Sequence, residues 1–166
     1  MPAVECLIVR NKCVLLMHRI QETTRSSMLV QIGDDVQSGE SAIECCLRRV
    51  RQVTGFQVAP SCAAVIMTVT PGKGTDYSLT FVAEGPAQEP AQRSAGILEW
   101  VALSELSERD DVSELDRQLI PRILSSSEPI TVLVDVDMTR PPTRRVAEIS
   151  TIDPARLSPL VFAVTS

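Results

Sequence analysis

Hydrophobic and polar positions divide the chain into short strand-like runs and two helical stretches. Near the amino terminus, AVECLIVR and CVLLMHR are apolar runs separated by Asn11 and Lys12, a pattern typical of a β-hairpin. A second pair, SCAAVIMTVT and TDYSLTFVAEG, is joined by PGKG, whose glycines favour a turn. The runs MLVQI, ILEWVAL and ITVLVDVD predict further strands, and RRVAEIS, after the turn at Pro141 and Pro142, is a weaker candidate.

The clearest predicted element is a helix over residues 41–54. Ser41 and Glu44 have the spacing of a capping box, and Gly55 stands where a left-handed residue commonly ends a helix. Apolar side chains recur along it at helical spacing, at Ile43, Cys46, Leu47, Val50 and Val53. We therefore expect this stripe, Leu47 and Val50 included, to be buried in the core.

A second helix is predicted over residues 113–124, where Leu115, Leu119, Ile120 and Ile123 share one side. Strands that alternate with two helices predict an α/β or α+β layer architecture. The length suits one domain, which we place at residues 1–153, followed by a tail at 154–166. The tail contains PLVFAV, which is apolar enough to pack on its own domain or on a neighbouring subunit. Residues 86–96 are predicted to form an exposed loop.

Charge and composition narrow the class of protein. No apolar run approaches the length of about 20 residues that a membrane helix needs, so we expect a cytoplasmic protein without a membrane partner. The net charge of −5 disfavours nucleic acid as a partner. The five cysteines lack the paired short spacings of a zinc site and are interpreted as reduced thiols. A homo-oligomer stays open.

The segment IGDDVQSGESAIECCLRRVRQVTGF, residues 32–56, carries the most specific motif. It resembles the Nudix box, the signature of the MutT-like pyrophosphohydrolases, in unbroken register. The matching positions are Gly39, Glu40, Ser41, Glu44, Leu47, Arg48, Val50, Thr54, Gly55 and Phe56. A later ILEWVALSEL is similar to the family's E-W-x-x-x-x-E-L stretch. The resemblance implies the Nudix fold, an α/β/α sandwich with a mixed sheet.

The sequence differs from the Nudix box at the positions that bind the metal in the family. In active members of the family, three glutamates of the box helix hold magnesium, and this sequence has Arg49, Gln52 and Val53 at those positions. Asp34 stands where the motif opens with glycine. We therefore expect no metal site, no cofactor and no standard pyrophosphohydrolase activity.

Four carboxylates in or beside the box could compensate for the missing ligands. Glu40 and Glu44 are catalytic candidates, and Asp34 and Asp35 are candidates for ligand binding. The structural interpretation is favoured: Glu44 as a capping partner, the two aspartates as turn formers, and Glu40 as a partner of Arg48.

Arg49 also has two interpretations. It is either a solvated residue of the exposed helix face, or a cation that replaces the metal and binds an anionic ligand directly. His18 is the single histidine, and without a recognisable nucleophile it is interpreted as structural.

The sequence is compatible with three functions. The first is a Nudix-like protein that binds a small anionic or nucleotide-like ligand without hydrolysing it. The second is an enzyme with altered chemistry on the same scaffold: a diphosphate hydrolase with relocated carboxylates, or a metal-independent catalyst of a specialised biosynthetic pathway. The third is a structural subunit whose PLVFAV tail covers the cleft.

Overall fold

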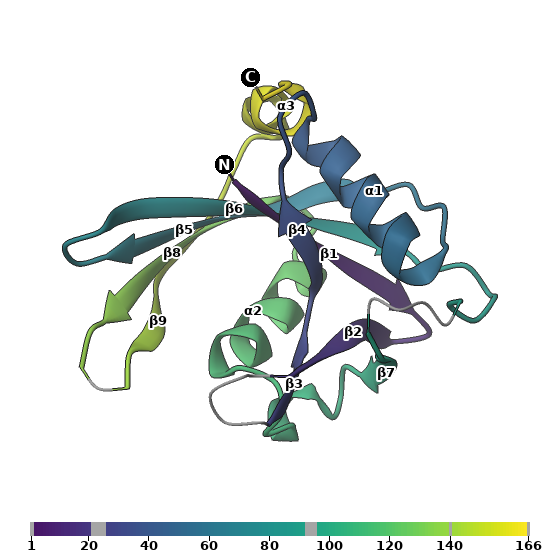
Figure 1. The fold of residues 1–166 in the computed structure, drawn as a ribbon. Coiled ribbons are helices and arrows are strands. Elements are labelled where there is room, and N and C mark those ends of the chain that lie inside the picture. Colours follow the sequence, from purple (N-terminus) through teal and green to yellow (C-terminus); the bar gives the residue numbers. More distant parts are fainter. Residues whose placement is uncertain (1, 21–25, 92–95, 140, 166) are drawn as a thin grey trace.

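The computed structural model describes residues 2–20, 26–91, 96–139 and 141–165. Within these ranges, nine strands form one mixed sheet (Figure 1). The strands are β1 (Ala3–Arg10), β2 (Cys13–Ile20), β3 (Ser27–Val30), β4 (Ile32–Asp35), β5 (Ser61–Thr70), β6 (Gly74–Glu84), β7 (Leu98–Ala102), β8 (Ile130–Asp137) and β9 (Thr143–Thr151). Along the sheet the order is β3-β2-β1-β6-β5-β8-β9, with β4 also paired to β1 and β7 to β2. The pairs β1 with β6 and β5 with β8 are parallel.

β1 is the strand that brings distant parts of the chain together. It forms the predicted hairpin with β2, whose turn has left-handed backbone at Asn11 and Lys12. It also pairs antiparallel with β4 and parallel with β6. The predicted run MLVQI is divided between β3 and β4, because β3 pairs with β2 whereas β4 pairs with β1.

The helices lie on both faces of the sheet, in line with the predicted α/β/α layers (Figure 1). They are α1 (Ala42–Thr54), α2 (Glu114–Ser125) and α3 (Pro154–Phe162), with a short 3-10 turn, η1, at Leu106–Glu108. One buried cluster joins α1 and α3 to the sheet, and the other joins α2 to the opposite face. In the part of the chain that is described, no helix is long and apolar enough to cross a membrane.

The ends of α1 follow the predicted signals. The Ser41 hydroxyl accepts a hydrogen bond from the Glu44 amide, and the Glu44 carboxylate accepts one from the Ser41 amide at 2.8 Å. Gly55 has a left-handed φ of 79°. The capping box therefore forms, and it engages the carboxylate of Glu44.

The buried face of α1 differs from the predicted stripe. Val50 is buried as expected, but the prediction for Leu47 is wrong, because this residue is 39% exposed. Ile43 is only partly buried. The side chains of Ala42 and Cys45 enter the core instead, so the helix is rotated about its axis relative to the stripe read from the sequence. The spacing of the apolar residues is compatible with burial of either Cys45 or Leu47, because these two residues lie on either side of Cys46.

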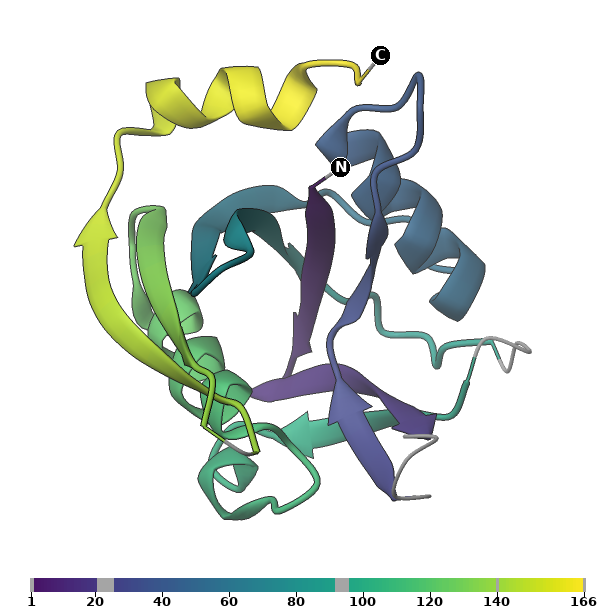
Figure 2. The ribbon, with the colours of Figure 1, turned by 60° about the vertical axis from the view of Figure 1, so that its left-hand side comes forward.

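The C-terminal segment packs on its own domain. α3 lies against α1 (Figure 2), and its Leu157 and Val161 are buried in the same cluster. Beyond α3, Thr165 binds the loop between β4 and α1. Its backbone amide donates to the Glu40 carbonyl at 3.1 Å, and its hydroxyl donates to the Gln37 carbonyl at 2.7 Å. The tail therefore holds the loop from outside. Residues 92–95 of the predicted 86–96 loop lie outside the described ranges.

We expect Val50→Asp to unfold the domain. An unpaired carboxylate in this core costs several kcal/mol, a large part of a typical stability of about 5–15 kcal/mol. Leu47→Asp, one turn away on the exposed face, is the matched control and should melt within a few degrees of the parent protein. Thermal unfolding followed by circular dichroism measures both, and equal melting temperatures for the two variants would contradict the observed rotation of α1.

Candidate functional site

Arg48 connects α1 to the loop that precedes it. Its Nε donates to Glu40 Oε1 at 2.7 Å and its Nη2 to Glu40 Oε2 at 3.0 Å, so the guanidinium holds both oxygens. Its Nη1 donates to Asp34 Oδ2 at 2.8 Å. These bonds from Arg48 lower the pKa of both carboxyl groups below their usual values. The expected contact between Arg48 and Glu40 is therefore present, and Asp34 is drawn into it.

The other carboxylates of the box differ in how far they are engaged. Glu44 is occupied by the cap, and the bonds from Ser41 lower the pKa of its carboxyl. Asp34 also accepts from the Asp35 amide at 3.0 Å. Asp35 itself is exposed and lies on the wall of a cleft. Both aspartates line this cleft, whereas Glu40 and Glu44 are absent from its lining residues.

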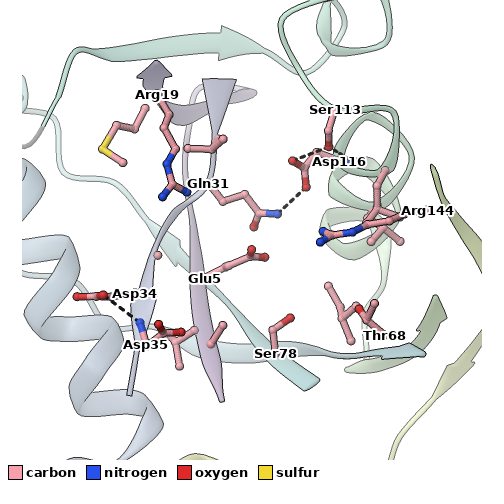
Figure 3. A pocket seen from close by; sticks show the side chains of 18 of the residues that line it. Glu5, Arg19, Gln31, Asp34, Asp35, Thr68, Ser78, Ser113, Asp116 and Arg144 are labelled. Carbon is pink, nitrogen blue, oxygen red and sulfur yellow. Dashed lines mark hydrogen bonds between the residues drawn. The ribbon is translucent and has the colours of Figure 1, made fainter. Parts of the chain in front are cut away.

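The cleft has a volume of about 1160 Å³ and opens between the sheet, α2 and β9 (Figure 3). Its lining comes from both halves of the chain, from β1 and β2 through α2 to β9, and includes none of the described residues of α3. The polar side chains labelled in Figure 3 are Glu5, Arg19, Gln31, Asp34, Asp35, Thr68, Ser78, Ser113, Asp116 and Arg144.

Arg49 lines this cleft from α1. It is half-buried, and its Nε donates to the Gly33 carbonyl at 3.0 Å. Gly33 permits close strand contact, because a Cβ there would lie 2.6 Å from the Val4 carbonyl oxygen. The other two positions that depart from the box point elsewhere: Gln52 is exposed, and Val53 is buried in the core. Of the three, Arg49 alone lines the cleft.

The sequence interpretation missed the polar group at the centre of the cleft. Gln31 donates from Nε2 to Asp116 Oδ1 at 2.9 Å, and Asp116 Oδ2 accepts from the Ser113 hydroxyl at 2.9 Å. Burial raises the pKa of Glu5 to about 7, with a further increase from Asp116 and an opposing effect of Arg144. An acidic residue in the apolar run AVECLIVR was the available signal, but nothing local linked it to Gln31 or Asp116.

His18 has a serine neighbour that the sequence did not suggest. Its Nδ1 lies 2.8 Å from the Ser27 hydroxyl, and its Nε2 lies 2.8 Å from Glu99. Glu99 is also bound by Arg109, through Nη1 at 2.7 Å. The pairing of β2 with β3 and β7 brings these groups together, so the histidine is fixed on the rim of the cleft.

A comparison with protein-family models matches residues 1–123 to the NUDIX domain. The chain belongs to the Nudix family. Solved structures agree on the fold: a MutT protein from Bacillus halodurans superposes with a TM-score of 0.70 and 23% identity, covering 88% of this chain and 97% of that one. A NUDIX hydrolase from Nitrosomonas europaea gives a TM-score of 0.60 and 24% identity, covering 73% and 87%. No curated protein sequence matches the chain significantly. The predicted Nudix fold is confirmed.

We expect the Arg48 contacts to make stability depend on acid. Because the folded-state pKa values of Asp34 and Glu40 are depressed, their stabilisation is complete above their ordinary values of 3.8 and 4.5, and it is lost as pH falls through the lower folded-state values. Arg48→Met should lower the free energy of unfolding at pH 7 by about 1–3 kcal/mol. It should also reduce the loss of stability between about pH 5 and pH 2.

Urea denaturation at a series of pH values measures this effect. Arg51→Met is the control, because Arg51 is exposed on the same helix. If Arg48→Met and Arg51→Met show the same acid dependence as the parent, Arg48 does not stabilise the loop.

Proposed function

We propose that this Nudix-family protein binds a small phosphate-bearing ligand, such as a nucleotide, directly through arginine and without the family's pyrophosphohydrolysis. The observation that carries the proposal is Arg49, which lies on the wall of the cleft at a position where the resemblance implies a magnesium-binding glutamate. A guanidinium supplies positive charge and several N–H donors to phosphate oxygens.

The donor set at the three box positions supports this proposal. Magnesium requires oxygen ligands at about 2.0–2.1 Å in octahedral geometry. Arg49 is a cation, Gln52 is exposed to solvent, and Val53 is an apolar side chain in the core. These three side chains therefore do not supply the oxygen ligands that a magnesium ion needs.

The contacts of the remaining carboxylates weaken the alternative of a hydrolase with relocated ligands. Glu40 and Asp34 are bound by Arg48, and Glu44 completes the cap of α1. Moving any of them to a metal would break a charge-assisted hydrogen bond that orders the loop. Asp35 alone of the four is exposed on the cleft wall.

Two further arginines support an anionic ligand. Arg19 on β2 and Arg144 on β9 line the same cleft as Arg49, so guanidinium groups reach it from three separate elements. Carboxylates also line it, which favours a ligand whose anionic part is confined to the arginines.

We expect ADP to bind without divalent metal. In isothermal titration calorimetry with EDTA present, Arg49→Gln should weaken ADP binding about tenfold or more, the effect of losing a charged hydrogen bond worth about 1.5–3 kcal/mol. Arg51→Gln makes the same change in charge on an exposed part of α1 and should stay within about twofold of the parent. Equal losses in the two variants would point to net charge alone, and binding that requires magnesium would contradict the proposal.

We also expect no turnover of nucleoside triphosphates, dinucleotides or nucleotide sugars in magnesium at mildly alkaline pH. Arg49→Glu alone should not create activity, because Gln52 and Val53 still lack carboxylates. Release of phosphate or nucleoside monophosphate is the measurement. Turnover by the unmodified protein of about 1 s⁻¹ or more would place it in the usual range of enzymes and refute the non-hydrolytic proposal.

A further inference from the structure

Three side chains from distant parts of the chain meet on the α2 side of the cleft. Glu5 comes from β1, Gln31 lies between β3 and β4, and Asp116 is in the first turn of α2. Figure 3 shows the carboxamide of Gln31 between the carboxyl groups of Glu5 and Asp116. All three residues line the cleft and lie outside the Nudix box at residues 32–56.

Gln31 lacks a hydrogen bond that its burial requires. The residue is only 7% exposed, and its Nε2 is used by Asp116. Its Oε1 is buried and has no hydrogen-bond partner among the described residues. A buried carbonyl oxygen without a donor is unfavourable, so we expect a donor to bind at this place.

Among the described residues, the charges of Glu5 and Asp116 are only partly balanced when both are ionised. Burial and the nearby Asp116 disfavour the charged form of Glu5, and Arg144 on β9 is the cation that favours it. Two carboxylates facing one guanidinium leave one negative charge unbalanced. Glu114 on α2 and the pair Asp34 and Asp35 on β4 add acidic groups to the same cleft, while Arg49 and Arg19 line its other walls.

A single ammonium group would supply both the missing hydrogen-bond donor for Gln31 and the missing positive charge for Glu5 and Asp116. It carries one positive charge and three N–H donors, which match one unbalanced charge and a set of carboxyl and carbonyl oxygens. A divalent metal would exceed the charge, and in the described ranges no group of three or more His, Cys, Asp or Glu side chains is arranged to hold one.

This acceptor group is a neighbour of Arg49. Glu5 pairs with Gly33 across β1 and β4, and the Gly33 carbonyl is the group that Arg49 binds at 3.0 Å. A Cβ on Gly33 would lie 3.2 Å from Cγ of Glu5. Arg49 and Glu5 are therefore both neighbours of Gly33, and both line the same cleft.

We infer that the ligand is a phosphorylated amine, whose phosphate binds Arg49 and whose ammonium group binds Glu5, Gln31 and Asp116. The inference rests on the proposed function for the phosphate end. An ammonium beside Glu5 stabilises its carboxylate, so a ligand that binds the protonated form displaces that proton to solvent. With a pKa of about 7 in the free protein, about half a proton per ligand is released at pH 7.

The test compares O-phosphoethanolamine with ethyl phosphate, which lacks the amine. Calorimetric titrations of the full chain with EDTA at pH 7, in two buffers of different ionisation enthalpy, give the affinity and the protons released. O-phosphoethanolamine should bind at least about tenfold more tightly than ethyl phosphate. Both phosphates can release part of a proton of their own, since the second pKa of a phosphate monoester is about 6, but O-phosphoethanolamine should release an additional fraction from Glu5.

Glu5→Gln should abolish both the preference for the amine and the additional proton release that accompanies it. Glu84→Gln, an exposed residue at the end of β6, is the charge-matched control and should behave as the parent. Arg49→Gln should weaken both ligands. Thermal melts verify that each variant is folded.

The outcomes separate the two proposals. Equal affinity for the two phosphates, with Arg49→Gln still weakening both, would overturn the amine site and leave the proposed function standing. Failure of both phosphates to bind the parent would overturn the amine inference, and the proposed function would fall as well only if ADP also failed to bind. Heat from magnesium chloride alone that is lost in Glu5→Gln would identify a metal site and overturn the amine inference.

Discussion

The guanidinium of Arg48 joins the parts of the chain on which the rest of this site depends. It links α1 to Glu40 in the loop and to Asp34 at the end of β4, in a partly buried position where both carboxylates stay ionised. A planar fork that satisfies several oxygens at once fixes direction as well as distance. On the outside of the same loop, Thr165 of the C-terminal segment adds backbone and hydroxyl bonds. The loop before α1 is therefore held by Arg48 on one side and by Thr165 on the other.

This arrangement changes what the box carboxylates are free to do. Glu40 and Asp34 are paired with Arg48, and Glu44 accepts the hydrogen bonds of the helix cap, so all three carboxylates are engaged in stabilising the loop or α1. Arg49 is left as the box residue that extends to the cleft with positive charge. The chain has the family's fold, but a fold alone does not establish a reaction, because the reaction depends on the side chains of the site.

The centre of the cleft carries acidic and amide side chains, in contrast to the cation Arg49. Across Gly33 from Arg49, the partly buried carboxyl groups of Glu5 and Asp116 lie on either side of the buried Gln31. Burial makes such groups sensitive to any donor or cation that enters, because the low local dielectric strengthens both the attraction and the cost of remaining unpaired. The pairing of β1 with β4 places Glu5 beside Gly33, whose carbonyl binds Arg49.

The sequence predicted correctly those elements that depend on hydrogen bonds between residues close together in the chain. The capping box and Gly55 mark α1 because their hydrogen bonds join residues a few positions apart, and Asn11 and Lys12 form the first turn for the same reason. The Nudix spacing also predicted the fold and the Arg48–Glu40 pair. The rotation of α1 that exposes Leu47 depended on which side chains β1 and α3 present to it. The meeting of Glu5, Gln31 and Asp116, like that of His18 with Ser27 and Glu99, depended on strand register and on the docking of α2. Those contacts join residues far apart in the chain, and pairing and packing are long-range choices that no short window of sequence encodes.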